Sequence, residues 1–321
     1  MVINDINIQR KRTGFRLNLI LKLYGINKSS YYAWFDDNGE LKSNIERQPI
    51  KTRILPEEIE RVINYRKEHR DVGYRKLTWM MNDANVAYMS ESSVYNLLSA
   101  RKMLYGWDSV KGTDTEKEYK HKPQFVHHHW HTDIAYIKIM DNYYFLIMLL
   151  DGYSRFLLGW ELMTDMLSSS VQMFVQRVKE KYPDARPMLI NDNGSQFISN
   201  DFKGLITRLQ IQQVFTRRNH PQTNGKIERM NKTVKDEAIR VKRPGSYQEA
   251  IDILQEYEYI YNYQRLHAGI KFLRPADVFF NRQEEVLRVR REKIQRARMN
   301  RIIQNNRRKY VSYSPLAKVQ F

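Results

Sequence analysis

The chain has 321 residues, contains no cysteine, and carries 54 Lys and Arg against 36 Asp and Glu, which gives a formal net charge of +18. The lack of cysteine excludes disulfides, thiol catalysis and zinc sites built on thiolates, and no apolar run approaches the ~20 residues of a membrane span. The positive excess favours a nucleic-acid partner over simple solubility, because each phosphate that a cation neutralises releases condensed counterions.

The first module that the sequence predicts, residues 1–41, is a helix-turn-helix. Apolar residues recur along residues 16–24, Gly25-Ile26-Asn27 interrupts the helix, and Lys28-Ser29-Ser30 opens another short helix. This pattern is typical of DNA-binding helix-turn-helix motifs, although a bare helical hairpin shows it too. Lys28 and Ser29 are the candidate DNA contacts. The start of the chain lacks the apolar segment of a signal peptide, so we expect a cytoplasmic protein.

A second helical module is predicted at residues 57–104, between the polar linkers 42–56 and 105–124. Pro56-Glu57-Glu58 begins its first helix with acids in the first turn. Gly73-Tyr74-Arg75-Lys76 begins the next helix, and Ser90 is a candidate cap for the third. Three short helices with scattered cations suit a DNA-reading module or a packing spacer. We favour DNA binding, with Arg75 and Lys76 as contacts.

Residues 125–281 have the periodicity of an α/β domain. Turn signals at Asp141-Asn142 and Asp151-Gly152 separate three strands. The predicted order is βββ-α-β-α-β-α, a mixed five-stranded sheet covered by helices. The predicted elements are strands 131–139, 143–150 and 155–162, helix 167–182, strand 187–191, helix 202–209, strand 211–215, and helices 224–241 and 246–265.

Three acids occupy unusual positions in this pattern. Asp133 lies inside the first strand, Asp192 ends the fourth, and Glu228 lies in the first turns of a helix. Buried carboxylates that converge would repel one another, and a divalent cation removes that repulsion. Oxygen ligands without cysteine favour Mg²⁺ or Mn²⁺. Taken singly, each acid also has an ordinary interpretation: a strand-end residue, a turn former, and a surface partner of Lys232.

Four motifs of this region resemble those of the integrase-type DDE recombinases. Trp130-His131-Thr132-Asp133 is similar to the family's first strand motif, and residues 149–155 resemble the corner between its second and third strands. Residues 191–197 (NDNGSQF) match its second-acid motif, and residues 220–229 (HPQTNGKIER) match its third. The resemblance spans residues 125–280 and implies an RNase H-like fold with Asp133, Asp192 and Glu228 as catalytic metal ligands.

Other segments resemble the transposases of bacterial insertion sequences. Tyr261-Asn262, Arg265-Leu266-His267 and Pro275 are similar to the tail of their catalytic domain. Residues 25–34 and 73–76 resemble the second reading-frame product (OrfB) of the family translated from two overlapping frames. The retroviral branch is disfavoured, because its amino-terminal zinc knuckle needs two cysteines.

The resemblance implies metal-dependent transposase chemistry with Mg²⁺ or Mn²⁺, two ions per active site. Water would cut DNA at the element end, and the freed 3′-OH would then attack another phosphodiester. The implied partners are the terminal inverted repeats, target DNA, and further copies of the chain in a homodimer or larger synaptic complex. The implied location is the bacterial cytoplasm, at the nucleoid. Two alternatives remain open: a structure-specific nuclease on this fold, or a non-catalytic DNA-binding regulator derived from a transposase.

Helical spacing predicts the groups that surround Glu228. Lys232 and Lys235 follow it at i+4 and i+7 and share its face, and the resemblance makes both contacts to the DNA backbone. Ile227, Met230, Val234 and Ala238 should pack on the sheet. Further candidate DNA contacts come from the third motif and from the polar loop 216–225: Asn224, Lys226, Arg229, Arg217 and Arg218.

The C-terminal tail, residues 282–321, is strongly basic, with 11 basic and 3 acidic side chains in residues 282–309. It could be a DNA-binding helix, a partner helix or a disordered arm, and we favour DNA contact. Three other features have structural interpretations. Histidines 127–129 and 131 read as a polar lead-in to the first strand, Asp151 as a turn residue, and tyrosines 247, 257 and 261 as an apolar helix face.

Overall fold

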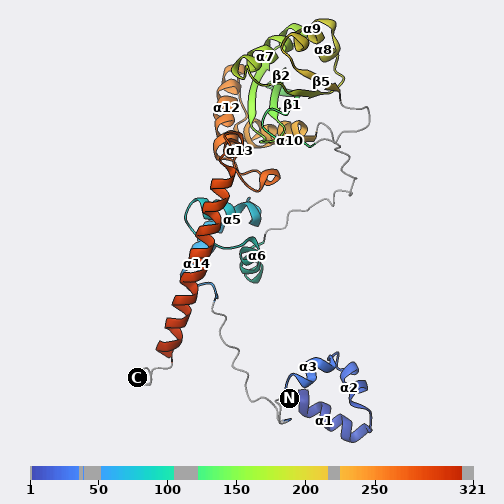
Figure 1. The fold of residues 1–321 in the computed structure, drawn as a ribbon, viewed down its shortest axis with the longest axis vertical. Helices are drawn as coiled ribbons and strands as arrows, with labels where there is room; N and C mark the ends of the chain where they lie inside the picture. Colours follow the sequence, from blue (N-terminus) through green and yellow to red (C-terminus); the bar gives the residue numbers. More distant parts are fainter. Residues whose placement is uncertain (1, 36–38, 40–51, 105–121, 216–224, 313–321) are drawn as a thin grey trace. The chain divides into compact units, whose positions relative to one another are not determined.

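The computed structural model describes residues 2–35, 39, 52–104, 122–215 and 225–312, so most of both predicted linkers lies outside the described residues. The chain divides into two units, Met1–Arg53 and Ile54–Phe321, whose elements are labelled in Figure 1. Within the described ranges, no helix combines the length and the apolar character needed to cross a bilayer.

The first unit is a small helical cluster of α1 (Val2–Thr13), α2 (Leu17–Leu23) and α3 (Lys28–Tyr32). The predicted glycine turn is present, and Gly25 has a φ of 65°, a left-handed conformation that glycine adopts without steric cost. The sequence did not predict α1, because this polar helix buries one side chain, Ile6, against α2. Its missing apolar stripe removes the signal on which a helix prediction depends.

The second unit begins with the predicted helical module: α4 (Pro56–Glu68), α5 (Tyr74–Asp83) and α6 (Glu91–Ala100). Ser90 is the N-cap of α6, as expected, since its Oγ accepts a hydrogen bond from the Ser93 N–H at 3.2 Å. The three helices share an apolar cluster of their own that includes Val62, Leu77, Met81, Val94 and Leu98.

A five-stranded mixed sheet forms the centre of the second unit, which confirms the predicted α/β order. Its strands lie in the order β3-β2-β1-β4-β5. β1 pairs antiparallel with β2 and β2 antiparallel with β3, whereas β1, β4 and β5 run parallel. The strands are β1 (His129–Ile139), β2 (Asn142–Asp151), β3 (Leu157–Met163), β4 (Met188–Asn191) and β5 (Gln212–Phe215).

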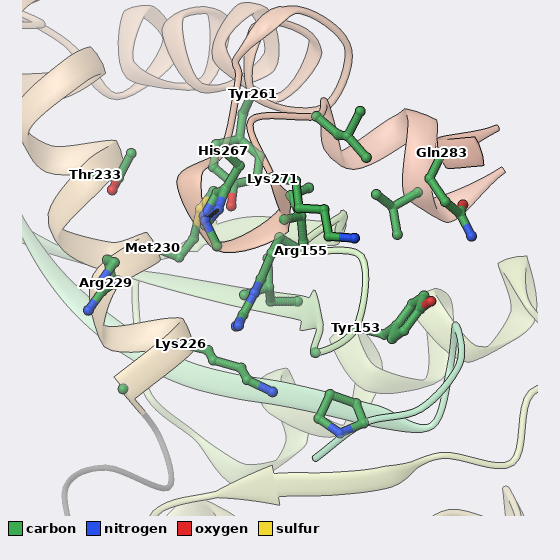
Figure 2. A pocket seen from close by; sticks show the side chains of 18 of the residues that line it. Tyr153, Arg155, Lys226, Arg229, Met230, Thr233, Tyr261, His267, Lys271 and Gln283 are labelled. Atoms are coloured by element: carbon green, nitrogen blue, oxygen red, sulfur yellow. Dashed lines mark hydrogen bonds between the residues drawn. The ribbon is translucent and has the colours of Figure 1, made fainter. Parts of the chain in front are cut away.

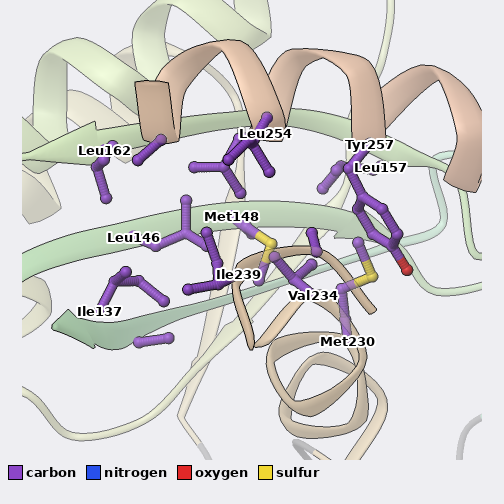
Figure 3. Close-up of a cluster of buried hydrophobic side chains, with 14 of the residues drawn as sticks. Ile137, Leu146, Met148, Leu157, Leu162, Met230, Val234, Ile239, Leu254 and Tyr257 are labelled. Atoms are coloured by element: carbon purple, nitrogen blue, oxygen red, sulfur yellow. The ribbon is translucent and has the colours of Figure 1, made fainter. Parts of the chain in front are cut away.

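Two apolar layers cover the sheet, one on each face. α7 (Ser168–Lys181), α8 (Ser195–Ile198) and α9 (Asn200–Arg208) cover one face. α10 (Gly225–Val234) and α12 (Tyr247–Tyr259) cover the other, where Figure 3 shows their side chains meeting those of β1–β3. Side chains alternate along a strand, so the odd-numbered residues of β1 from Ala135 to Ile139 face α10. The predicted apolar faces of both helices are confirmed.

Both long helices on this face contain a π-helical turn, at Lys235–Ile239 and at Ile260–Gln264. The predictions of uninterrupted helices at 224–241 and 246–265 were therefore wrong in this respect, because side-chain periodicity cannot reveal a one-residue insertion. Arg265 follows the second turn and donates to both carboxylate oxygens of Glu237 in the first, at 2.6 and 2.8 Å. Although burial raises it, the pKa of Glu237 is lowered overall by Arg265 and Tyr257. This ion pair joins the two π turns.

Asn262, in the segment that resembles the tail of the transposase catalytic domain, has a structural role. This side chain is fully buried and bonds the backbone at the start of β3, accepting from the Leu157 N–H at 2.8 Å and donating to the Leu157 C=O at 3.0 Å. The end of α12 is therefore fixed to the sheet. After a short 3₁₀ turn, Ala268–Ile270, the chain forms α13 (Pro275–Phe279).

The basic tail forms one long helix, α14 (Gln283–Ser312), and residues 313–321 lie outside the described part. Two of its arginines are almost fully buried in ion pairs with the second helical module. Arg290 pairs with Asp83 of α5, and Arg301 pairs with Glu58 of α4. The interpretation of this segment as a DNA-contacting arm is wrong for these two arginines, because intrachain carboxylates already bind them. Sequence reasoning counted the charges without their partners.

Candidate active site

Two of the three predicted acids follow the paired segments of neighbouring parallel strands. β1 and β4 are parallel neighbours in which His131 pairs with Ile190. Asp133 and Asp192 each follow these paired residues by two positions, and Asp192 lies directly after the end of β4. Asp133 has the parity of Ala135, so its side chain is directed to the face that α10 covers. The third acid, Glu228, lies in the first turn of that helix.

The negative charges of Asp192 and Glu228 act on the partly buried Asp133. The pKa of Asp133 is raised to about 6, mainly by burial and in addition by the negative charges of Asp192 and Glu228, against the lowering effect of hydrogen bonds from the Ile134 backbone and Asn231. Each of the three acids comes from a different element, so the tertiary fold brings them together. This mutual repulsion is the arrangement that a bound cation relieves.

Asn231 holds Asp133 in place, a role that sequence reasoning missed. Its Nδ2 donates to Asp133 Oδ2 at 2.8 Å, across 98 residues of sequence. Asn231 follows Glu228 by three positions, so helical spacing could have placed it on the face of α10 that carries the candidate site. Asp192 accepts a hydrogen bond from the Gly194 N–H at 3.0 Å, which makes it a turn former as well as a candidate ligand.

A cavity of about 430 Å³ opens between β1 and α10. Asp133, Glu228 and Asn231 line it together with Lys232 and Lys235. The predicted common face of Glu228, Lys232 and Lys235 is therefore present in the structure. Arg240, which the sequence did not single out, adds another cation at this cavity. The arrangement combines carboxylates that can hold a cation with ammonium groups that can bind phosphate.

The donor set fits a hard divalent cation in its chemistry. All three candidate ligands are carboxylates, and their mutual repulsion favours an added positive charge. In the described residues, however, no group of three His, Asp or Glu side chains is close enough to hold a metal ion as it stands.

Two other groups of titratable residues have structural roles. Asp151 is fully buried in the turn between β2 and β3 and accepts hydrogen bonds from the backbone of His127, Tyr153 and Ser154, which confirms it as a turn residue. His129 and His131 are also buried inside β1, so the interpretation of the histidine cluster as a polar lead-in was wrong for these two. Because side chains alternate along a strand, His129 and His131 point to the same face of the sheet.

The remaining predicted DNA contacts lie in different surroundings. Lys226 and Arg229 line a second, larger cavity; burial and the nearby Arg155 lower the pKa of Lys226 to about 7. Lys76 was expected to be an open DNA contact, but it is half-buried, and burial and Arg265 lower its pKa. Arg75 is exposed and lies 3.6 Å from Glu91. Lys28 and Ser29 begin α3 in the first unit, and Arg217, Arg218 and Asn224 lie outside the described residues.

Comparisons with known proteins agree with this geometry. Residues 124–221 match the family model described as Integrase core domain, and residues 209–275 match a second model of the same description. The transposase of insertion sequence element IS904 from Lactococcus lactis is 27% identical over 46% of this chain, and the match spans 59% of that protein. An uncharacterized 31 kDa protein of insertion element IS600 from Shigella sonnei is 19% identical over 79% of this chain and 95% of its own length.

Among solved structures, the chain is similar to the HTLV-2 integrase catalytic core domain in complex with magnesium. The identity is 16%, the TM-score is 0.41, and the match covers 48% of this chain and 97% of that core. Two models described as Integrase core domain together match residues 124–275, the region that contains the mixed five-stranded sheet and the helices on its two faces. Both of the similar IS904 and IS600 proteins come from insertion sequences, at 27% and 19% identity.

Proposed function

We propose that the chain is a DNA transposase that cuts a phosphodiester at the end of an insertion sequence and joins the freed 3′-OH to another strand. The observation that carries this proposal is the cavity that Asp133 and Glu228 line together, beside the parallel pairing of β1 with β4, after which Asp192 follows directly. The function fits the net positive charge, which favours a polyanionic substrate.

In the proposed reaction, Asp133, Asp192 and Glu228 would hold Mg²⁺ or Mn²⁺, with two ions per active site. When bound, such ions assist deprotonation of the attacking oxygen and offset the negative charge that develops on the leaving oxygen. The protein side chains would otherwise contribute by positioning the metal ligands and the DNA phosphates. Asn231 holds the Asp133 carboxylate toward the shared site, and Lys232 and Lys235 at the same cavity would bind phosphate oxygens on either side of the scissile bond.

The proposed reaction has two balanced steps. Water attacks the phosphorus and loses a proton, the bond from phosphorus to the 3′ oxygen breaks, and that oxygen leaves as a 3′-OH. The 3′-OH then attacks a phosphodiester of another strand and displaces that strand's 3′ oxygen. No covalent bond to the enzyme forms, so the nucleophile needs no serine, cysteine or tyrosine.

The proposed partners are the inverted repeats at the element ends, target DNA, and further copies of the chain. Transposition joins two element ends at once, so we propose a homodimer or larger synaptic complex on DNA. We also propose the OrfB-like subfamily, the bacterial cytoplasm and an association with the nucleoid. The helix-turn-helix of the first unit and the exposed Arg75 are proposed to bind DNA outside the catalytic core.

The test is a strand-transfer assay with the full chain and a duplex that carries the inverted repeat flanking its reading frame, already cut to expose a 3′-OH. We expect joined products with Mg²⁺ or Mn²⁺, none after EDTA, and recovery when either ion is restored. Cleavage of an uncut duplex without any joining of the pre-cut one would instead indicate a nuclease. Recovery with Zn²⁺ alone would contradict the oxygen-ligand assignment.

Asn231→Ala should lower strand transfer by about 10- to 100-fold, because loss of a group that orients a metal ligand typically costs this much. The variant keeps all three carboxylates but frees Asp133 from its 2.8 Å hydrogen bond. Its signature should be a higher Mg²⁺ concentration at half-maximal activity, a readout that general destabilisation would not produce. Asn231→Gln, which retains the amide, should recover part of the loss; an unchanged Mg²⁺ requirement would exclude a positioning role.

A further inference from the structure

A second cavity, of about 1120 Å³, lies beside the candidate active site. Glu228 and Lys232 line both cavities, so the first turns of α10 form a wall between them. Figure 2 shows the larger cavity with side chains reaching into it from the turn after β2, from α10 and from the segment before α13. Its volume exceeds the ~300–1,000 Å³ that is usual for small-ligand sites, and it is large enough for a segment of polymer.

The lining of this cavity is strongly cationic. Six basic side chains face two acids, Glu228 and Glu284. Three of the six converge from segments far apart in the sequence: Arg155 between β2 and β3, Lys226 in α10, and Lys271 before α13. His267 also lines this cavity, and its pKa is lowered to about 3, mainly by burial and in addition by the positive charges of Arg265, Arg155 and Arg229. Cations that converge without an equal number of acids mark a site for an anion.

Two of these cations are presented on unusual backbone. Arg155 has a φ of 66° and Lys271 a φ of 58°, both in the left-handed region that side chains other than glycine and asparagine seldom adopt. The turn that carries Arg155 is held by the buried Asp151, which accepts from the backbone and hydroxyl of Ser154. Gly152 packs so closely on His131 in this turn that a Cβ there would lie 2.8 Å from its ring. A tightly built turn therefore directs Arg155 toward the cavity.

We propose that this cavity binds the phosphodiester backbone of the DNA strand that passes the candidate active site, with Arg155 and Lys271 as phosphate contacts. The proposal deepens the proposed function and rests on it. Neither residue belongs to the predicted DNA-binding set, and their contacts would be independent of sequence, as phosphate contacts are. Because the two cavities share a wall at Glu228, a strand held by Arg155 and Lys271 would be led toward the three carboxylates.

The test measures how the affinity for DNA depends on salt. The probe is a mixed-sequence duplex of about 30 base pairs, bound to the full chain in Mg²⁺ with NaCl varied. Each phosphate contact contributes about 0.9 to the slope of log affinity against log salt. Arg155→Asn and Lys271→Asn remove the charges with a residue that tolerates positive φ, and an unchanged thermal midpoint verifies folding. Lys203→Ala on the exposed surface of α9 removes one charge outside the cavity and is the control.

We expect each cavity variant to flatten the slope by about 0.9 and to weaken binding about five-fold at 0.15 M salt, with the double variant showing both losses. An equal loss in Lys203→Ala, or no loss in the cavity variants, would overturn the proposal. ATP, tested separately, distinguishes a site for free phosphates: ATP binding that the variants abolish while the duplex slope stays unchanged would also overturn it. If the cavity variants still carry out strand transfer and their slope of log affinity against log salt is unaltered, this phosphate site is refuted but the proposed transposase function is not.

Discussion

Asp192→Asn should reduce both DNA cutting and strand transfer by at least about 10³-fold, while the affinity for DNA stays within about two-fold of the original chain. The amide keeps the size of the side chain and can still accept the Gly194 hydrogen bond at the turn, so the fold should be preserved. It loses the negative charge that a divalent cation requires, and electrostatic groups at a reacting centre are typically worth 10² to 10³ or more in rate. Gel assays of cutting and joining, beside a binding titration, measure the separate effects.

Asp201→Asn is the matched control. Asp201 is an exposed acid in the first turn of α9, so this substitution makes the same chemical change outside the site. It should retain full activity. If Asp192→Asn cut and joined DNA normally, the carboxylate assignment would be wrong and the non-catalytic regulator would become the better interpretation. If the variant lost DNA affinity as well, Asp192 would have a structural role that the turn geometry does not account for.

Arg301→Met should destabilise the second unit by about 3–5 kcal/mol, because it leaves the carboxylate of Glu58 buried without its partner. Both residues are only 6% exposed, and Arg301 donates to Glu58 at 2.7 and 2.9 Å and to the Tyr88 carbonyl at 2.7 Å. Since 1 kcal/mol shifts the thermal midpoint of a large domain by about 2–4 °C, a fall of about 10 °C is expected. Calorimetry or circular dichroism on heating measures it.

Two further variants separate burial of charge from loss of packing. Glu58→Gln in the Arg301→Met background removes the unpaired charge, so part of the lost stability should return. Arg288→Met lies on the same helix, but its pairs with Glu285 and Glu292 are exposed, so it should change the free energy of unfolding by less than about 0.5 kcal/mol. Equal effects of Arg301→Met and Arg288→Met would show that α14 does not depend on the buried pair.

Local patterns were sufficient to predict the α/β domain. The continuous apolar strand at β2, the turn signals beside it and the helical stripe of Ile227, Met230 and Val234 all appear in the structure where they were expected. Alternation and helical spacing are properties of neighbouring residues, so one sequence carries them in full. The three acids were singled out for the same reason, since a charged residue is conspicuous in an apolar strand or beside a turn.

Features that depend on distant partners were not predictable. The bond from Asn231 to Asp133 joins residues 98 positions apart, and that from Arg301 to Glu58 joins residues 243 positions apart. The sequence of a basic segment does not reveal which arginines pair with buried carboxylates elsewhere in the chain. The positive charge of α14 was therefore interpreted as a sign of DNA binding. The π turns were missed because an inserted residue alters the backbone without altering the composition of the helix.

Glu228 and Lys232 line both cavities, so under the proposed function a ligand in either cavity would contact the same turns of α10. A ligand that shifts this turn of α10 would change the affinity of both cavities for their ligands, and such coupling is reciprocal. A cation gathered by the carboxylates would then tighten the hold on a nucleic-acid strand to the same degree that the strand tightens the hold on the cation. The reaction would be fastest when both the cation and the DNA strand are bound, so that hydrolysis in the absence of the DNA strand would be slow.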